Sequence, residues 1–202
     1  MMIIKMLNIK IMKRILYFLL LILVVVSCKN SPKGETQSTE VETKSEVVAD
    51  ERGYIVKVGD MVPNIDINLL DGTSFNITEL KGKVVMLQFT ASWCGVCRKE
   101  MPFIERDIWN VYKDNPDFAL YGIDLKESKE ETEAFTAAIP VTYPLTLDLE
   151  GKSFYSFCGE GAGVTRNIIL DREGKIIMLT RLFDEAEFAQ MVEVIDNELN
   201  KE

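Results

Sequence analysis

Two nearly continuous apolar runs of strand length lie in the middle of the chain. They are VVMLQFT at residues 84–90 and FALYGID at residues 118–124. Such runs are typical of strands that are buried on both faces of a parallel or mixed sheet. Farther along, YPLTLD at 143–148 predicts a third strand or extended segment. NIIL at 167–170 and KIIML at 175–179 flank the turn sequence DREG and predict a hairpin.

Segments with helical spacing of apolar residues alternate with these strands. Four such residues predict a helix over about 97–112. A second helix is expected over 128–138, because Ser and Glu stand three apart at its start, as in a capping box. Asp184, with Glu187 three residues later, predicts the start of a last helix, whose apolar stripe is core packing.

The order of these elements predicts the fold class. Strands alternate with helices and are followed by a hairpin and a terminal helix, which favours an α/β fold with right-handed crossovers and a mixed central sheet flanked by helices. Residues 53–70 hold short β-favouring pieces broken by Gly59 and Pro63, and predict an N-terminal β extension.

The N-terminus has the layout of an export signal. Four basic side chains within the first 14 residues precede the apolar run 15–26, which ends in Ser27 and Cys28. The run is shorter than the about 20 residues that a membrane-spanning helix needs. Basic, then apolar, then small residues are typical of a signal peptide, here residues 1–27.

The sequence VVSC resembles a bacterial lipobox, in which the signal is cut before the cysteine and the cysteine is lipidated. Cys28 would then be the first mature residue, and its acyl chains would anchor the protein to a membrane. We therefore expect a lipid-anchored protein of the bacterial cell envelope, with its domain in the periplasm. An ordinary cleaved signal and an uncut anchor with an incidental cysteine are the alternatives.

Residues 28–52 are polar and contain no aromatic side chain, which predicts a disordered tether before a single domain at 53–202. The whole chain of 202 residues has a net charge of −9, and without residues 1–27, whose only charged side chains are the four basic ones, it has −13. An acidic chain repels phosphate backbones, so nucleic-acid binding is not expected.

The chain contains no histidine. This excludes Cys-His and Ser-His nucleophile pairs on this chain and zinc sites that need histidine. It also excludes haem attachment at the CxxC motif of Cys94 and Cys97, because Arg98 rather than histidine follows the motif.

Cys94 falls where the first buried strand ends and its helix begins. Unpaired N–H groups and the positive end of the helix dipole stabilise a thiolate there. Cys97 lies about one turn farther on, so Cys94 can attack a disulfide and Cys97 can resolve the mixed disulfide. A structural disulfide would close a very small loop and contribute little. A zinc half-site lacks its second ligand pair.

The motifs GDMVPNI, GKVVMLQFTASWCGVCRKEMP and GVTRNIILDREGKI span most of residues 53–202. Together they resemble the TlpA/ResA group of exported, membrane-tethered thiol-disulfide oxidoreductases, which have a thioredoxin-like fold and are related to the AhpC/TSA redoxins. The resemblance implies a redox-active disulfide between Cys94 and Cys97, no cofactor and no metal.

The resemblance also suggests roles for residues near the two cysteines. Trp93 would pack beside the disulfide, and Pro102 matches the proline that kinks the helix. Glu100 matches an acidic residue that accepts or relays a proton from the thiols, although an exposed helix-face carboxylate is an equal alternative. Val164 and Thr165 would form the substrate-docking loop.

Three positions depart from the family pattern. Thr165 stands where the family has a cis-proline, and a cis bond before a non-proline residue costs roughly 2.5–4 kcal/mol, so a trans Val164–Thr165 bond is favoured. Gln88 replaces the buried acid of cytosolic thioredoxins, and Val96 replaces the usual proline between the cysteines. The direction of electron flow is therefore left open.

We expect a monomeric enzyme that exchanges disulfides with cysteine-containing exported proteins, such as apocytochromes, and with a membrane electron donor. The alternatives are a lipoprotein that binds Cu(I) or another soft metal through the two thiols, a thiol peroxidase, and a non-catalytic scaffold. Cys158 would be a buried inert thiol, or else a third redox thiol near the docking loop.

Overall fold

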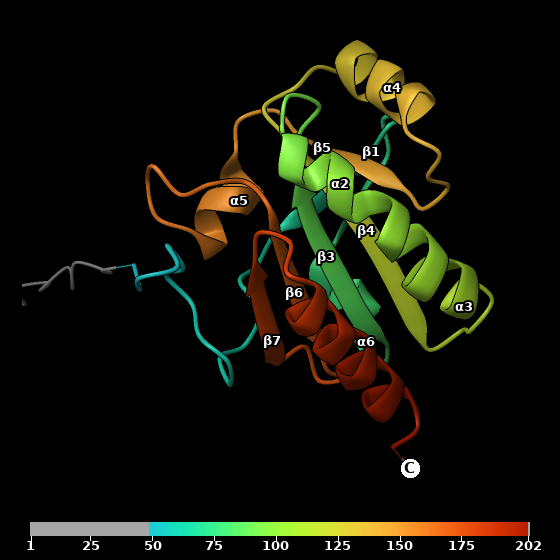
Figure 1. The fold of residues 1–202 in the computed structure, drawn as a ribbon. Helices are drawn as coiled ribbons and strands as arrows, with labels where there is room; N and C mark the ends of the chain where they lie inside the picture. Colours follow the sequence, from blue (N-terminus) through green and yellow to red (C-terminus); the bar gives the residue numbers. More distant parts are fainter. Residues whose placement is uncertain (1–48, 202) are drawn as a thin grey trace, which may run out of the picture. The chain divides into compact units, whose positions relative to one another are not determined.

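The computed structural model describes residues 49–201 (Figure 1). The predictions of a signal peptide at 1–27, of lipidation at Cys28 and of most of the tether lie outside the described residues. Helices and strands follow one another in this order: β1 (Asp66–Leu69), β2 (Ser74–Asn76), 3-10 helix η1 (Ile77–Leu80), β3 (Val84–Thr90), α2 (Gly95–Ile104), π-helix η2 (Glu105–Trp109), α3 (Asn110–Tyr112), β4 (Phe118–Leu125), α4 (Lys129–Ala138), β5 (Leu145–Asp148), α5 (Lys152–Phe157), β6 (Arg166–Leu170), β7 (Ile176–Arg181) and α6 (Glu185–Leu199).

Seven strands form one mixed sheet in the order β2-β1-β5-β4-β3-β6-β7. The three strands β3, β4 and β5 are parallel, whereas β6 pairs antiparallel with β3, and β7 with β6. The β1–β2 hairpin adds antiparallel to β5. The α/β fold class and the mixed sheet flanked by helices are thereby confirmed.

Strand β3 lies inside the sheet, between β4 and β6, and is buried along its whole length. Its side chains alternate between two cores: Val84 and Met86 pack with α2, α4 and α6, whereas Val85, Leu87 and Phe89 pack with η1 and α5. This two-sided burial explains why the run 84–90 is apolar without alternation. Figure 1 shows α2, α3 and α6 crossing one face of β3.

The helix after β3 is continuous from α2 through η2 to α3, close to the predicted span 97–112. Pro102 lies inside α2 and has no N–H to donate to the preceding turn. The π-helical turn η2 follows directly, and such a turn widens the helix by one residue. The expected kink proline therefore lies where the helix departs from regular α geometry.

Side-chain caps fix where two other helices begin. The Ser128 hydroxyl accepts from Glu131 N, and the Glu131 carboxylate accepts from Ser128 N at 2.8 Å, which is the predicted capping box of α4. Asp184 accepts from the backbone of the first turn of α6, as expected. Helix α5 was not predicted, because its sequence KSFYSF is too short to show a helical period.

Within the described part of the chain, no helix combines the length and apolar character needed to cross a membrane.

Candidate active site

Cys94 and Cys97 are joined by a disulfide at the start of α2, with their Cα atoms 5.3 Å apart. Cys94 is the N-cap residue of this helix, directly after the loop that leaves β3. Its sulfur accepts a hydrogen bond from Cys97 N at 3.2 Å, one of the N–H groups that a helix leaves unpaired at its start. The same contact would stabilise a Cys94 thiolate once the disulfide is reduced.

The two sulfur-bearing residues differ in exposure. Cys94 keeps 8% of its surface accessible, whereas Cys97 has none. An incoming thiolate therefore meets Cys94 first, and Cys97 is shielded by its surroundings. This order of exposure fits the predicted division into an attacking and a resolving cysteine.

Thr165 brings a hydroxyl to both sulfurs. Its Oγ1 lies 3.2 Å from Cys94 Sγ and 3.2 Å from Cys97 Sγ. The preceding bond to Val164 is trans, since residues 49–201 contain no cis peptide bond. Both residues of the predicted docking loop are buried, and Thr165 O accepts from Leu182 N at 3.1 Å. Thr165, which stands where the resemblance leads one to expect a cis-proline, thus supplies a hydrogen-bond donor here.

Glu100 is buried on the face of α2 that also carries Cys97, one turn farther along the helix. Burial raises the pKa of its carboxyl to about 7, against the opposing effect of the amides of Asn167 and Gln88; the charge of Glu187 adds to the increase. The alternative interpretation of Glu100, an exposed carboxylate on the helix face, is therefore wrong. A carboxyl that titrates near neutrality can both donate and accept a proton.

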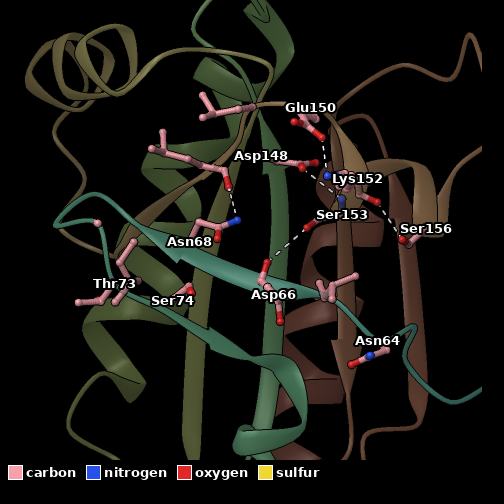
Figure 2. A pocket seen from close by; sticks show the side chains of 15 residues that line it. Asn64, Asp66, Asn68, Thr73, Ser74, Asp148, Glu150, Lys152, Ser153 and Ser156 are labelled. Carbon is pink, nitrogen blue, oxygen red and sulfur yellow. Dashed lines mark hydrogen bonds and ion pairs between the residues drawn. The ribbon is translucent and has the colours of Figure 1, made fainter.

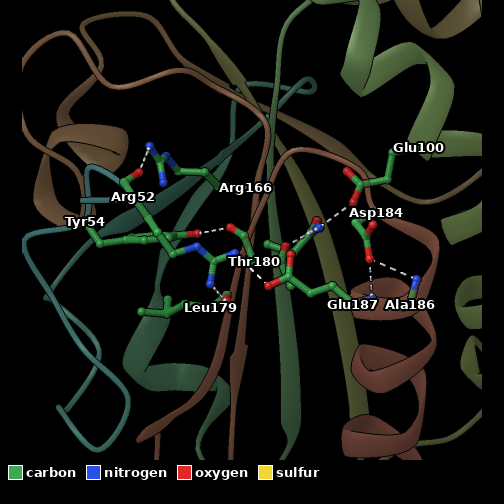
Figure 3. A network of polar contacts seen from close by, with 10 residues as sticks. Arg52, Tyr54, Glu100, Arg166, Leu179, Thr180, Asp184, Ala186 and Glu187 are labelled. Atoms are coloured by element: carbon green, nitrogen blue, oxygen red, sulfur yellow. Dashed lines mark hydrogen bonds and ion pairs between the residues drawn. The ribbon is translucent and has the colours of Figure 1, made fainter. Parts of the chain in front are cut away.

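Asn167 of β6 holds this carboxyl and was missed by sequence reasoning. Its Nδ2 donates to Glu100 Oε1 at 2.7 Å and to Thr180 Oγ1 at 2.9 Å. Figure 3 shows Glu100 and Thr180 on either side of this contact, with Glu187 of α6 nearby. An asparagine at the start of the apolar run NIIL was the available signal, because a polar side chain in a buried strand needs a partner.

Three exposed apolar side chains belong to the CxxC segment or to the residue that bonds to the docking loop. Trp93, which was expected to pack beside the disulfide, is 68% exposed, so most of its surface is open to solvent. Val96, between the two cysteines, and Leu182, which follows β7, are also exposed. Leu182 has a left-handed backbone with φ of 65°, held by its bond to the docking loop.

Cys158 lies apart from this chemistry. It is buried, and its backbone forms an isolated bridge with Tyr54. Burial raises the pKa of its thiol to about 12, which disfavours the reactive thiolate. The structure therefore favours an inert core thiol over a third redox thiol.

A hollow of about 510 Å³ lies between the β1–β2 hairpin and the segment that joins β5 to α5 (Figure 2). Asp148 lines it, and its carboxylate accepts from Ser153 N at 3.1 Å and from Phe154 N at 2.9 Å. None of the lining residues belongs to the loop around the disulfide. The described residues contain no cluster of three or more cysteine, aspartate or glutamate side chains that could hold a metal ion.

Comparison with known proteins agrees with this geometry. The Redoxin family model matches residues 57–199. A thiol-disulfide oxidoreductase ResA from Bacillus thuringiensis is 27% identical over 122 residues, which cover 60% of this chain and 68% of that protein.

Solved structures show the same fold. A candidate protein disulfide isomerase from Bacteroides thetaiotaomicron is 56% identical, with a TM-score of 0.71 over 74% of this chain and 94% of that one. A candidate thiol:disulfide interchange protein DsbE from Chlorobium tepidum is 24% identical, with a TM-score of 0.62 over 72% and 99%, and shows the fold alone. With a thioredoxin-like fold and a disulfide at the start of its first long helix, the chain belongs to the Redoxin family, as a thiol-disulfide oxidoreductase of the TlpA/ResA type.

Proposed function

We propose that this oxidoreductase is anchored in the bacterial cell envelope and exchanges disulfides with exported proteins through Cys94 and Cys97. The observation that carries the chemistry is the disulfide at the N-terminus of α2, with the Thr165 hydroxyl 3.2 Å from each sulfur. The position of the disulfide stabilises a thiolate, and the hydroxyl can donate to whichever sulfur bears the charge.

Exchange begins when a thiolate of the partner protein attacks Cys94 Sγ. A bond forms between the two sulfurs, the Cys94–Cys97 bond breaks, and Cys97 leaves with the electron pair. A second partner thiolate then attacks the partner's own sulfur in the mixed disulfide and releases Cys94. The partner is oxidised and the cysteine pair is reduced, and the reverse sequence reduces a partner disulfide at the expense of a membrane electron donor.

Glu100 would donate a proton to Cys97 and accept one from it in these steps. With a pKa of about 7 it is protonated in part of the molecules, and can neutralise the departing thiolate. In the reverse direction its carboxylate accepts the proton of Cys97 and produces the thiolate that resolves the mixed disulfide. Asn167 keeps Oε1 of this carboxyl in place by a hydrogen bond of 2.7 Å.

Envelope anchoring is supported by the first 28 residues. A basic segment, a short apolar run and the sequence VVSC match the signal of a bacterial lipoprotein. The polar stretch that follows Cys28 would hold the domain away from the membrane surface. In this location the domain would exchange disulfides with exported proteins that expose cysteine pairs, such as apocytochromes.

Trapping in cells tests the partner class. Cys97→Ser keeps the attacking cysteine but cannot resolve the mixed disulfide, so adducts with exported proteins are expected to accumulate and to dissolve on reduction. The Cys94→Ser/Cys97→Ser double variant is the control and should form none. Adducts that are equally abundant in the double variant would remove the proposal.

Lipid labelling and fractionation test the anchor. In cells fed labelled palmitate, the wild-type chain should carry label and sediment with membranes, whereas Cys28→Ser should lose both properties. Cys158→Ser is the matched control, because this buried cysteine has no part in anchoring. An unlabelled wild-type chain would contradict lipidation at Cys28.

A further inference from the structure

A carboxyl group is buried without a donor at the end of β4. Asp124 has no exposed surface, and neither of its carboxyl oxygens accepts a hydrogen bond from a protein N–H or O–H group. The nearby hydroxyl of Thr132 donates instead to Ser128 O at 3.0 Å. An ionised carboxylate without donors in such a place carries a large desolvation cost.

The partner of Asp124 is a second carboxyl. Glu127 is 6% exposed, and its carboxyl lies close enough to Asp124 to help raise the pKa of Asp124. Lys126 between them has a left-handed backbone with φ of 59°, which turns the chain so that Glu127 folds back beside β4. Two neighbouring buried carboxyl groups favour a state with one proton between them, since two negative charges close together repel.

Glu127 in turn holds the loop that precedes the disulfide. Its Oε2 accepts from Ser92 N at 2.6 Å, and its Oε1 accepts from the Ser92 hydroxyl. Ser92 stands two residues before Cys94, and Arg98 Nη1 donates to Ser92 O at 3.1 Å. The backbone of this loop is thereby fastened to the turn after β4 on one side and to α2 on the other.

We propose that Asp124 and Glu127 are positioning residues for Cys94: with one proton between them they hold the Ser92 loop in place, and a second negative charge loosens it. Burial and then the neighbouring carboxyl of Glu127 raise the pKa of Asp124 to about 8, against the lowering effect of Thr132. Against the opposing effect of burial, the pKa of Glu127 is lowered, first by Asp124 and then by Ser92. The pair therefore carries one negative charge at neutral pH and two above about pH 8.

Among the described residues, no Lys or Arg forms an ion pair with Asp124 or Glu127, and the Lys126 amine contacts the Tyr155 hydroxyl instead. From α4, Glu131 adds negative charge near Asp124. The neighbours on the adjoining strands, Thr90 and Leu147, are uncharged. Arg98 of α2 donates to the Ser92 carbonyl rather than to either carboxylate.

Nuclear magnetic resonance of the oxidised full-length chain tests this clamp, formed by Asp124, Glu127 and Ser92. In the oxidised chain Cys94 and Cys97 form a disulfide and do not titrate, so they do not disturb the measurement. The Ser92 amide and the Trp93 indole signals are expected to shift with a midpoint near the pKa of Asp124, while the Trp109 indole, bonded to Thr142 Oγ1 at 2.9 Å, stays as reference. Asp124→Asn should abolish this transition. Glu130→Gln, an exposed change of equal charge on α4, should retain it.

The same variants test the effect on the reaction, on the premise that Cys94 is the attacking thiol. The rate at which reduced protein reacts with dipyridyl disulfide, divided by the measured thiolate fraction of Cys94, should fall about tenfold from about pH 7 to about pH 9, because a loosened loop no longer holds Cys94 in the attacking geometry. Asp124→Asn should remove this fall, and Glu130→Gln should not.

The proposal is overturned if the chemical shift of the Ser92 amide does not change above about pH 7. It is also overturned if this signal shows the same pH transition in Asp124→Asn as in the wild type. If Asp124→Asn does not fold, Glu127→Gln serves the same purpose, because it too leaves a single titrating group. Absence of exchange in every protein, with the amide transition intact, would count against the oxidoreductase mechanism and leave the clamp supported.

Discussion

At the scale of single residues, the site depends on polar side chains that are buried beside sulfur. Thr165 reaches both cysteines, and Glu100 is held by Asn167 one helical turn from Cys97. In a buried setting each hydrogen bond is stronger than in water, and each missing partner is more costly. Small changes of these side chains should therefore have measurable effects on the ionisation of the thiols.

Replacing Glu100 with Gln removes the carboxyl whose pKa is raised to about 7. We expect resolution of a mixed disulfide between Cys94 and glutathione to speed up in the wild type as the pH rises through this value. In Glu100→Gln this increase should be absent and resolution at pH 8 roughly a hundredfold slower, which stopped-flow release of glutathione measures. Equal pH profiles would contradict a proton-transfer role.

The same substitution should alter the pH dependence of stability in the disulfide form. The folded state retains the proton of Glu100 up to a pKa of about 7, whereas an unfolded glutamate loses it near the ordinary pKa of 4.5. The free energy of unfolding should therefore fall on the order of 3 kcal/mol as the pH rises across this interval. Denaturant unfolding of Glu100→Gln should lack this part of the decrease.

Thr165→Val removes the hydroxyl and keeps the shape of the side chain. Loss of a hydrogen bond to the thiolate should raise the pKa of Cys94 by about one unit in reduced protein. Thr165→Ser keeps the donor and should leave the pKa near that of the wild type. Thiolate absorbance against pH measures both, and identical curves for the valine and serine variants would exclude the hydroxyl as a donor.

At the scale of elements, helices start and stop where side chains satisfy their terminal groups. Cys94, Ser128 and Asp184 each accept from the first turn of the helix that follows. In α2 the cap is the reactive sulfur itself, so the group that begins the helix also carries out the chemistry. The π-helical turn after Pro102 lets the same helix continue to Tyr112.

Asp184→Ala should destabilise the domain by about 1 kcal/mol, because the N–H groups of Ala186 and Glu187 lose their acceptor. Asp184→Asn keeps an acceptor oxygen and should recover most of the stability. Chemical denaturation of both variants, with the disulfide intact, measures the difference. Equal losses in the two variants would show that charge, rather than capping, is the main contribution.

The larger elements could be predicted because each has a strong local signal. Residues 84–90 are β3 exactly as the apolar run indicates, and the capping box sets the start of α4. Helix α5 and the π-helical turn were not predictable, because neither differs in pattern from the loop or helix around it. The bounds of β5, β6 and β7 differ from prediction by only one or two residues.

The site could be predicted only in its local part. Cys94, Cys97 and Glu100 lie in one motif, so their spacing placed them together. Asn167 and Asp124 come from other strands and meet this motif only through the order of the sheet. The signal for both was a polar residue at the end of a buried run, which indicates that a partner exists but does not identify it.

At the scale of the whole molecule, the segment before the first strand is fastened to the far edge of the sheet. Arg52 donates to Leu179 O at 3.1 Å and pairs with Glu187 at 2.6 Å, and the Tyr54 hydroxyl donates to Thr180 O. Arg166, fully buried, donates to Arg52 O at 2.7 Å and stacks over the Tyr54 ring. Figure 3 shows these side chains together.

Arg52→Gln should change the pKa of Glu100 in the active site through this network. Without its ion pair, Glu187 is left as an uncompensated negative charge that raises the pKa of Glu100. The pH midpoint of mixed-disulfide resolution should move upward by a few tenths of a unit, a modest effect because the pair is partly solvated. Arg106→Gln, which breaks the exposed pair with Asp107, should leave the midpoint unchanged.

The attachment of Arg52 also bears on where the chain can be shortened. A fragment that starts at residue 53 lacks the carbonyl to which Arg166 donates, and leaves that guanidinium enclosed with one acceptor fewer. Such a fragment would differ from the parent in the strand next to Thr165 and not merely in length. Work on an excised domain should accordingly begin upstream of Asp50, whose side chain and backbone bond to Tyr54.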